Sequence, residues 1–198
     1  MEQDIYYKGY KIKIREDDNP DSPNDWEDNE LFLVYSHRQF TVRRKGFDPE
    51  NIFYNPEHFS EYYILPVEAY IHSGVLLSLF TGEKYCKWDS SVTGYILPSK
   101  TNFKSMEDAS RAAESLIQLW NDYLLGNIYG FIIEKPVTTY SISKEKFETL
   151  KFENDLANLE GEFDIYDEWL QMDSCWGFYG NPETSGCIDE AKATIDNY

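Results

Sequence analysis

Apolar and polar residues alternate along the first half of the chain in a pattern that predicts β-strands. Between residues 6 and 14, Tyr10, Ile12 and Ile14 alternate with lysines, and a period of two is typical of a half-buried strand. Further runs rich in aromatic, β-branched or other apolar residues predict strands over residues 31–42, 62–67, 69–80 and 92–97.

Glycine and proline divide these runs. Gly74 interrupts the run over 69–80, and we expect it to form a hairpin or a bulge there. Residues 46–60 read as a loop, because Pro49 and Pro56 punctuate a stretch without a clear period.

The pattern changes to a helical one after residue 104. Ser105, followed by Glu107 and Asp108, has the composition of an N-cap and an acidic first turn. Apolar residues then recur every three or four positions, and Gly126 stands where a helix-ending glycine belongs. This spacing predicts one amphipathic helix over about residues 105–125, packed by its apolar face on a sheet.

The last third of the chain mixes both kinds of element. The pattern predicts a strand over 128–134 that stops at Lys135-Pro136 and can resume over 137–143. It also predicts a helical segment over 144–159, a short strand over 175–179 and a closing helix over 188–198. Strands and helices do not alternate regularly, which disfavours a doubly wound fold. We expect an α+β fold in a single domain spanning residues 1–198, with a mostly antiparallel sheet, one long helix and one or two shorter helices.

Charge is distributed unevenly along the 198 residues. There are 36 acidic and 18 basic residues, for a formal net charge of −18. An acidic loop over 16–30 and an acidic segment over 153–173 contain no base, whereas residues 37–45 contain four bases and no acid. A field of this sign repels nucleic acid and anionic membranes and attracts basic surfaces. The tracts therefore indicate a class of partner rather than a reaction.

Aromatic and cysteine content narrow the class of protein further. Sixteen Tyr, twelve Phe and five Trp exclude a disordered acidic chain and predict a packed core. The three cysteines, Cys86, Cys175 and Cys187, have no metal-ligand spacing. Because there is no long apolar run and no signal-like start, we expect free thiols in a reducing cytoplasm.

One set of residues suggests a reaction. Phosphate-binding, zinc-protease and nucleophile-elbow motifs are absent. A thiol site can nevertheless be assembled from Cys86 or Cys175 as nucleophile and His72 as its base, with Asp89 or Asp173 orienting the imidazole.

A structural role is the alternative for these cysteines, and we favour it. Free cysteine is among the most buried residue types, so Cys86 and Cys175 are expected as small buried side chains. Trp88 and Trp176 would then be core aromatics.

Neither a metal ion nor a cofactor is expected. His37, His58 and His72 are the only imidazoles, and the cysteines lie too far apart in sequence to suggest a four-ligand zinc site. Acidic pairs such as Asp17 and Asp18 lack the spacing of a calcium-binding loop.

The acidic tracts are candidates for binding a basic partner. Each contains aromatic residues; interface hot spots favour Trp and Tyr, and Lys or Arg pairs with carboxylates and stacks on rings. The alternative is that these charges only keep the chain soluble. The candidate binding residues are Asp17, Asp18, Asp21, Asp25, Trp26, Glu27 and Asp28 in the first tract, and Glu160, Glu162, Asp164, Asp167, Glu168 and Trp169 in the second.

Four stretches carry a resemblance to a known family: residues 62–74, residues 86–96 with Cys86-Lys87-Trp88-Asp89-Ser90, residues 126–131, and residues 173–180 with the sequence DSCWGFYG. Over most of its length the chain resembles a family of uncharacterised proteins encoded by phages and mobile elements of gut and Gram-positive bacteria. Lys87 and Ser91 stand where the family usually has Pro and Gly. The resemblance implies a small acidic accessory protein of the kind that blocks host defence, including CRISPR and restriction enzymes.

Two main hypotheses follow. The first is an inhibitor that occupies a basic nucleic-acid-binding surface of a host defence nuclease, of the anti-CRISPR or anti-restriction type, with carboxylates in place of phosphates and no direct binding to nucleic acid. The second is a small cytoplasmic enzyme that uses the Cys/His/Asp set. A solubility-driven accessory domain or a homo-oligomer is a third reading.

Overall fold

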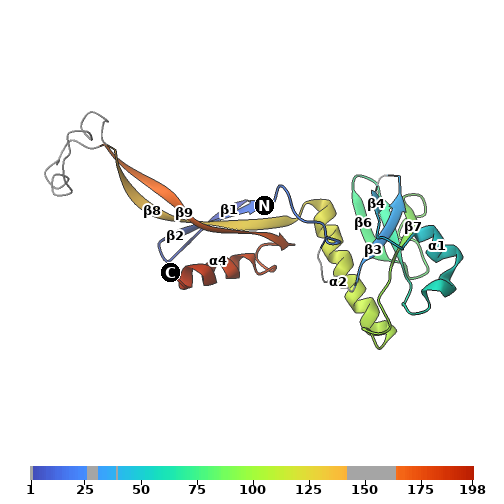
Figure 1. Cartoon of the computed structure of the whole chain (residues 1–198). Coiled ribbons are helices and arrows are strands. Elements are labelled where there is room, and N and C mark those ends of the chain that lie inside the picture. Colours follow the sequence, from blue (N-terminus) through green and yellow to red (C-terminus); the bar gives the residue numbers. More distant parts are fainter. Residues whose placement is uncertain (1, 26–30, 39, 142–163) are drawn as a thin grey trace. The chain divides into compact units, whose positions relative to one another are not determined.

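Figure 1 shows a computed structural model of the chain, which describes residues 2–25, 31–38, 40–141 and 164–198. The chain divides into two compact units. Unit 1 comprises Met1–Arg15, Gly130–Trp176 and Gly186–Tyr198, and unit 2 comprises Glu16–Tyr129 and Gly177–Ser185. The fold class is α+β, with mostly antiparallel sheets and one long helix, as predicted. The expectation of one domain stays a prediction.

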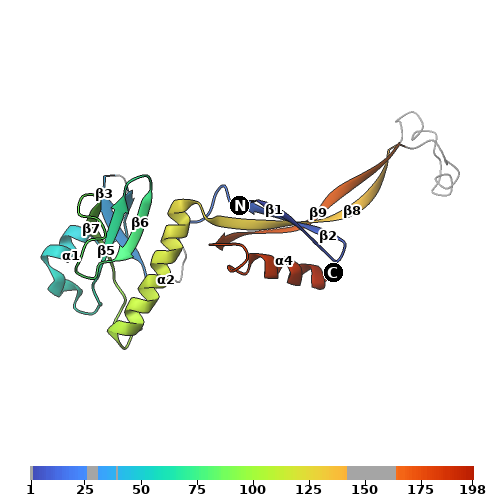
Figure 2. The ribbon, with the colours of Figure 1, turned by 180° about the vertical axis from the view of Figure 1, so that it is seen from behind.

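The described residues of unit 1 form a four-stranded sheet. Its order is β1-β2-β8-β9, and in Figures 1 and 2 the helix α4 lies along the sheet. Ile12, Ile14 and Ile133 are buried on the strands. The bounds are β1 Gln3–Tyr7, β2 Tyr10–Glu16, β8 Ile128–Ser141, β9 Asp164–Tyr179 and α4 Cys187–Asp196, whose buried residues are Cys187, Ala191 and Ile195. Packing of these two apolar faces forms the core of the unit.

The single strand predicted over 6–14 is wrong, because the chain forms a hairpin there. β1 and β2 pair antiparallel, with Tyr7 opposite Tyr10. The two residues between them, Lys8 and Gly9, have φ angles of 48° and 83°. Positive φ at both positions suits a tight hairpin turn, whose usual signal is Asn or Asp before Gly. Lys8 stands where Asn or Asp would signal the turn, so the alternation of apolar and polar residues alone suggested one strand.

β9 is longer than the predicted strand over 175–179. It begins at Asp164 and includes much of the acidic segment, although acidic residues are depleted in strands. Its first ten side chains are all exposed, so pairing with β8 rather than burial determines its conformation. β8 runs through Pro136 without the stop predicted there, and the helix predicted over 144–159 lies outside the described residues.

Unit 2 has a five-stranded antiparallel sheet with helices on opposite faces. The strand order is β4-β3-β7-β5-β6, and Figure 2 shows α2 on one side of this sheet and α1 on the other. Gly74 lies in the β5–β6 hairpin, as predicted. The bounds are β3 Leu33–His37, β4 Phe40–Val42, α1 Pro49–Tyr54, the 3₁₀ helix η1 Pro56–Phe59, β5 Leu65–Ile71, β6 Val75–Leu79, β7 Ser90–Ile96 and α2 Met106–Leu125.

Two predictions in unit 2 are wrong. The strand predicted over 31–42 is the β3–β4 hairpin, with His37 opposite Phe40. Residues 46–60, predicted as a loop, contain α1 and η1. Pro49 and Pro56 begin these helices rather than prevent them, because proline is favoured in the first helical turn, where its missing N–H costs nothing.

The long helix α2 matches the prediction closely. The Ser105 hydroxyl accepts a hydrogen bond from the Asp108 amide at 3.1 Å, and Gly126 ends the helix with a φ of 71°. Leu116 and Trp120 pack with strand residues such as Val67 in one buried cluster. Among the described residues, no helix combines the length and apolar character needed to span a bilayer.

Candidate functional site

The first acidic tract begins with a loop whose backbone is held at several points. The Asp17 amide donates to the Ile128 carbonyl at 2.8 Å, and the Asp17 carboxylate accepts from the Asn19 amide at 3.1 Å. Further along, the Asn24 side chain donates to the Leu33 carbonyl at 3.0 Å. The loop therefore presents its carboxylates from a fixed backbone rather than from a free tail.

Tyr179 shows that the carboxylates of this loop gather in space. Its hydroxyl donates to the backbone carbonyl of Asp21. Burial raises the pKa of Tyr179 to about 12, and the negative charges of Asp21, Asp17 and Asp25 contribute to the rise, together with Tyr123. A neighbouring anion disfavours the phenolate, so the charges of these three predicted residues act on the same hydroxyl. Asp18 is exposed nearby in sequence, and Trp26, Glu27 and Asp28 lie outside the described residues.

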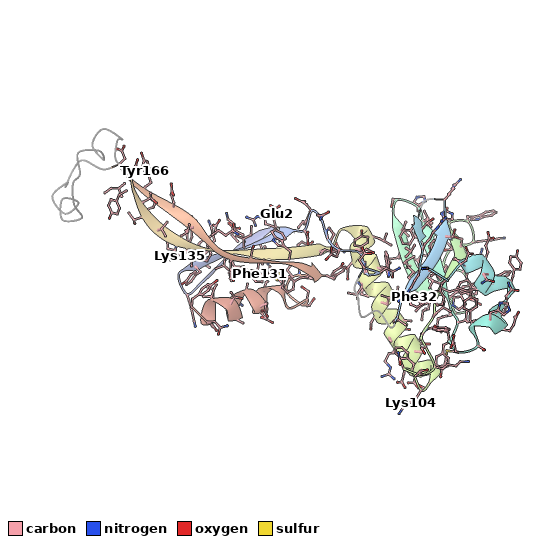
Figure 3. The ribbon with its side chains drawn as sticks, viewed as in Figure 1. Glu2, Phe32, Lys104, Phe131, Lys135 and Tyr166 are labelled. Carbon is pink, nitrogen blue, oxygen red and sulfur yellow. The ribbon has the colours of Figure 1, made fainter. Side chains whose placement is uncertain are left out.

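The second tract places its carboxylates on a two-stranded ribbon, the part of β8 and β9 near residues 136–141 and 164–171. Figure 3 shows Tyr166 near the end of this ribbon and Lys135 further back on β8. The Thr138 hydroxyl contacts the Asp167 carboxylate at 3.1 Å, and the Thr139 hydroxyl contacts Glu168 at 3.4 Å. These contacts restrain two exposed carboxylates. Asp164 is also exposed on β9, and Glu160 and Glu162 lie outside the described residues.

The cations of unit 1 pair with acids outside the predicted binding set. Glu134 contacts Lys11 at 2.8 Å and Lys13 at 2.7 Å, and Arg15 contacts Asp4 at 2.8 Å. Across the described ranges, no ion pair joins Asp164, Asp167 or Glu168 to a base, and the same holds for Asp17, Asp18, Asp21 and Asp25. These seven carboxylates of the described residues therefore have no cationic side chain of the chain itself in ion-pair contact.

The Glu134 cluster is a buried charge site that the sequence analysis did not identify. Glu134 is 8% exposed and Lys11 is also 8% exposed. Burial opposes ionisation of Glu134, but hydrogen bonds and attraction from Lys11 and Lys13 outweigh it, so the pKa of Glu134 lies below its usual value. No local pattern signals this cluster, because its members come from different strands.

Trp169, a predicted binding residue, has part of its ring occupied within the unit. The Lys11 ammonium lies 4.3 Å from its ring centroid, and the Tyr6 ring lies 6.0 Å away. The indole remains 40% exposed. Apolar side chains along β9 that the sequence analysis did not propose as binding residues are also exposed: Ile165, Tyr166, Leu170 and Met172.

The expectation of buried cysteines beside core tryptophans is wrong. Cys175 is exposed and Cys86 is half-buried, whereas Cys187 is the buried thiol. Trp88 is 85% exposed and Trp176 is 44% exposed. Burial, followed by the neighbouring Cys175 thiol, raises the pKa of Cys187 to about 11.

Part of the predicted thiol site does come together in unit 2. The Asp89 carboxylate lies 3.8 Å from the His72 Nδ1 and 3.8 Å from the Cys86 Sγ. Of these three residues, Asp89 lines a small cleft of about 190 Å³, together with Arg38 and Trp88. The order of contacts does not suit thiol catalysis, since the group next to the sulfur is a carboxylate rather than the imidazole that must take its proton.

The remaining residues of that set belong to the other unit. Cys175 and Asp173 belong to unit 1, where the Asp173 carboxylate accepts from the Tyr198 hydroxyl at 3.2 Å. Where the structure describes the chain, no group of three or more His, Cys, Asp or Glu side chains is arranged to hold a metal ion.

Comparisons of the chain with models of protein families, with curated proteins and with solved structures found no match.

Proposed function

We propose that the chain is an inhibitor that binds a basic protein surface through its carboxylates. The surface is the nucleic-acid-binding face of a host defence nuclease, of the CRISPR or restriction type, in the cytoplasm of a bacterial host. The uneven charge and the resemblance to mobile-element proteins support this proposal.

One observation carries the proposal: the β8–β9 ribbon presents carboxylates without cationic partners among the described residues. Asp164, Asp167 and Glu168 are exposed, while nearby lysines of the same sheet are engaged by Glu134. Carboxylates used only for solubility are usually interspersed with bases. A base-free set on a paired strand instead suits a cationic partner.

The spacing along a strand is compatible with a surface that binds a nucleic-acid backbone. A strand rises about 3.3 Å per residue, and one strand of B-DNA carries a phosphate about every 3.4 Å along the axis. Because successive side chains point to opposite faces, Asp164 and Glu168 share one face of β9, separated by about four phosphate spacings of one DNA strand, and Asp167 lies on the other face. The major groove of DNA admits a two-stranded ribbon, so such a ribbon is narrower than the duplex itself. It can therefore enter a protein channel that is wide enough for a duplex.

The loop carboxylates around Tyr179 add to the long-range attraction. With a formal charge of −18, the chain is steered toward basic surfaces at low salt. Steering raises the association rate, whereas close pairing at the ribbon determines how long the complex persists.

The test is protection of phage from a nuclease defence in cells. Phage plating is measured in bacteria that carry a CRISPR or restriction system, with and without the protein. Wild-type protein should raise plating, and the triple variant Asp164→Asn, Asp167→Asn, Glu168→Gln should lower this effect at least about tenfold, because three charged contacts are lost.

A matched control separates position from net charge. The triple variant Glu61→Gln, Glu83→Gln, Glu114→Gln removes the same number of charges from exposed positions outside both tracts and should keep wild-type protection. The proposal is wrong if the two triple variants protect equally. It is also wrong if the ribbon variant and a variant neutralised at Asp17, Asp18 and Asp21 both protect as the wild type does.

A second candidate, an enzyme using Cys86, has one observation in its favour, the contacts of Asp89 with both His72 and Cys86. A reactive thiolate is alkylated rapidly at neutral pH. Alkylation of Cys86 in the native protein at the rate of the same residue in urea, or more slowly, would remove this candidate.

A further inference from the structure

β9 is an unusually long edge strand without the usual protection. It has 16 residues, against about five or six for a typical strand, and it is the outermost strand of its sheet. Natural edge strands are commonly protected by lysine or proline, and β9 contains neither, nor any arginine. In the described part of the chain, no strand pairs with β9 on the side away from β8. Its outward N–H and C=O groups are thus available over residues 164–171.

The side chains along the same stretch combine charge with apolar surface. Asp164, Asp167 and Glu168 are interleaved with Ile165, which is 63% exposed, and Leu170, which is 50% exposed. Scattered single apolar residues on a surface are normal, whereas a contiguous set indicates an interaction site. Because side chains alternate between the faces of a strand, the exposed apolar side chains of β9 form two sets, Tyr166, Leu170 and Met172 on one face and Ile165 and Trp169 on the other.

We infer that an extended basic segment of the partner adds to the free edge of β9 as a further strand. The inference rests on the proposed function and specifies the structure of the contact at the same ribbon. In this mode, main-chain hydrogen bonds supply affinity and alternate side chains supply specificity. Lysines or arginines at alternate positions of the added strand lie on the face of Asp164 and Glu168, and its intervening apolar side chains lie on the other face, beside Ile165 and Trp169.

Charge favours a basic segment over a second copy of the chain as the occupant. Two β9 strands paired edge to edge would bring base-free acidic strands together, and like charges opposite each other destabilise a sheet. A basic strand replaces that repulsion with cross-strand ion pairs. Cation–π contacts are also available to it, as Lys11 already makes one with Trp169 within unit 1.

The experiment uses the full-length chain and two synthetic peptides. One peptide has about ten residues of alternating lysine and valine, the length that spans residues 164–171. The other has the same sequence, but every second backbone amide is N-methylated. One edge of this peptide therefore lacks N–H donors, while its charge is unchanged. Affinity is measured by calorimetry at low salt, and hydrogen exchange of the β9 amides is followed by NMR.

The unmodified peptide should bind, and N-methylation should weaken binding at least about tenfold, since several hydrogen bonds are lost at once. Alternate amides of residues 164–171 should gain protection from exchange only with the unmodified peptide. Along β9, N–H groups point alternately toward β8 and away from it. One of the two variants Leu170→Pro and Gln171→Pro therefore removes only an outward N–H. That variant should stay folded and bind both peptides equally weakly.

Other outcomes separate this inference from the proposed function. Equal affinity for the two peptides, with no protection of the β9 amides from exchange, would overturn strand addition. The proposed inhibition through charge would then still be tested by the plating assay. Failure of both peptides to bind would also overturn it. Concentration-dependent protection of β9 without peptide would assign the edge to a second copy. If both proline variants unfold, the peptide comparison and the exchange data decide the question.

Discussion

Glu134 illustrates at the residue scale how burial selects which charges pair within the molecule. The carboxylate is buried beside Lys11 and Lys13, where an unpaired charge is costly. The described acids of the two tracts are mostly exposed and have no such requirement. Sequence reasoning found the tracts by composition, but it missed this cluster, because its partners are distant in the chain.

Replacing Glu134 with Gln should lower the free energy of unfolding by about 2 kcal/mol at neutral pH, because two lysines lose their buried counter-charge. The same substitution at exposed Glu114 should have little effect. The lowered pKa of Glu134 gives the sign of its pH dependence: its contribution is present above the ordinary value of 4.5 and is lost as the pH falls through the folded-state pKa. Urea unfolding at several pH values would measure both effects, and a wild-type-like pH dependence in the Glu134→Gln variant would contradict this account.

Asn121 is a second residue whose side chain holds two elements together. Its Oδ1 accepts from the Leu77 amide at 2.8 Å, and its Nδ2 donates to the Leu77 carbonyl at 3.0 Å. Replacing it with Leu should cost about 2 kcal/mol, because β6 is left with unpaired buried groups. Ser115→Ala on the exposed side of α2 is the control. Equal unfolding midpoints for the two variants in urea would show that the amide does not stabilise the unit.

At the scale of elements, the sequence predicted correctly the helices and strands whose ends are determined by neighbouring residues. The helix α2 was predicted almost to the residue, because Ser105 and Gly126 are strong local end signals. The β1–β2 hairpin was missed because Lys8 is an unusual turn residue, and α1 because Pro49 was taken as a helix breaker. The length of β9 was missed because pairing with β8, which no local pattern reports, keeps its acidic part extended.

Gly130 on β8 provides a test of that pairing. A Cβ at this position would lie 2.3 Å from the Trp176 ring and 2.6 Å from the Cys175 carbonyl. Gly130→Ala should therefore displace β9 and destabilise the protein by about 1–3 kcal/mol. Gly74→Ala is the matched control, since nothing lies within 4 Å of its Cβ. Faster hydrogen exchange in β9 for Gly130→Ala alone is expected, and equal exchange in the two variants would refute the close packing of Trp176 on Gly130.

At the scale of the whole molecule, the net charge of −18 determines how the protein meets a partner. Attraction between exposed charges is screened over about 8 Å at physiological salt. Binding that depends on the acidic tracts should therefore weaken steeply as salt rises. Binding through apolar surface alone would be nearly independent of salt.

The most direct measurement is the salt dependence of affinity between the protein and a nuclease complex whose activity it lowers in the plating assay. The wild type should show a steep loss of affinity with salt. The variant Asp164→Asn, Asp167→Asn, Glu168→Gln should bind more weakly at low salt with a clearly smaller slope, while the Glu61, Glu83 and Glu114 control keeps the wild-type slope. Equal slopes for the wild type and the ribbon variant would contradict the claim that these carboxylates form the contact.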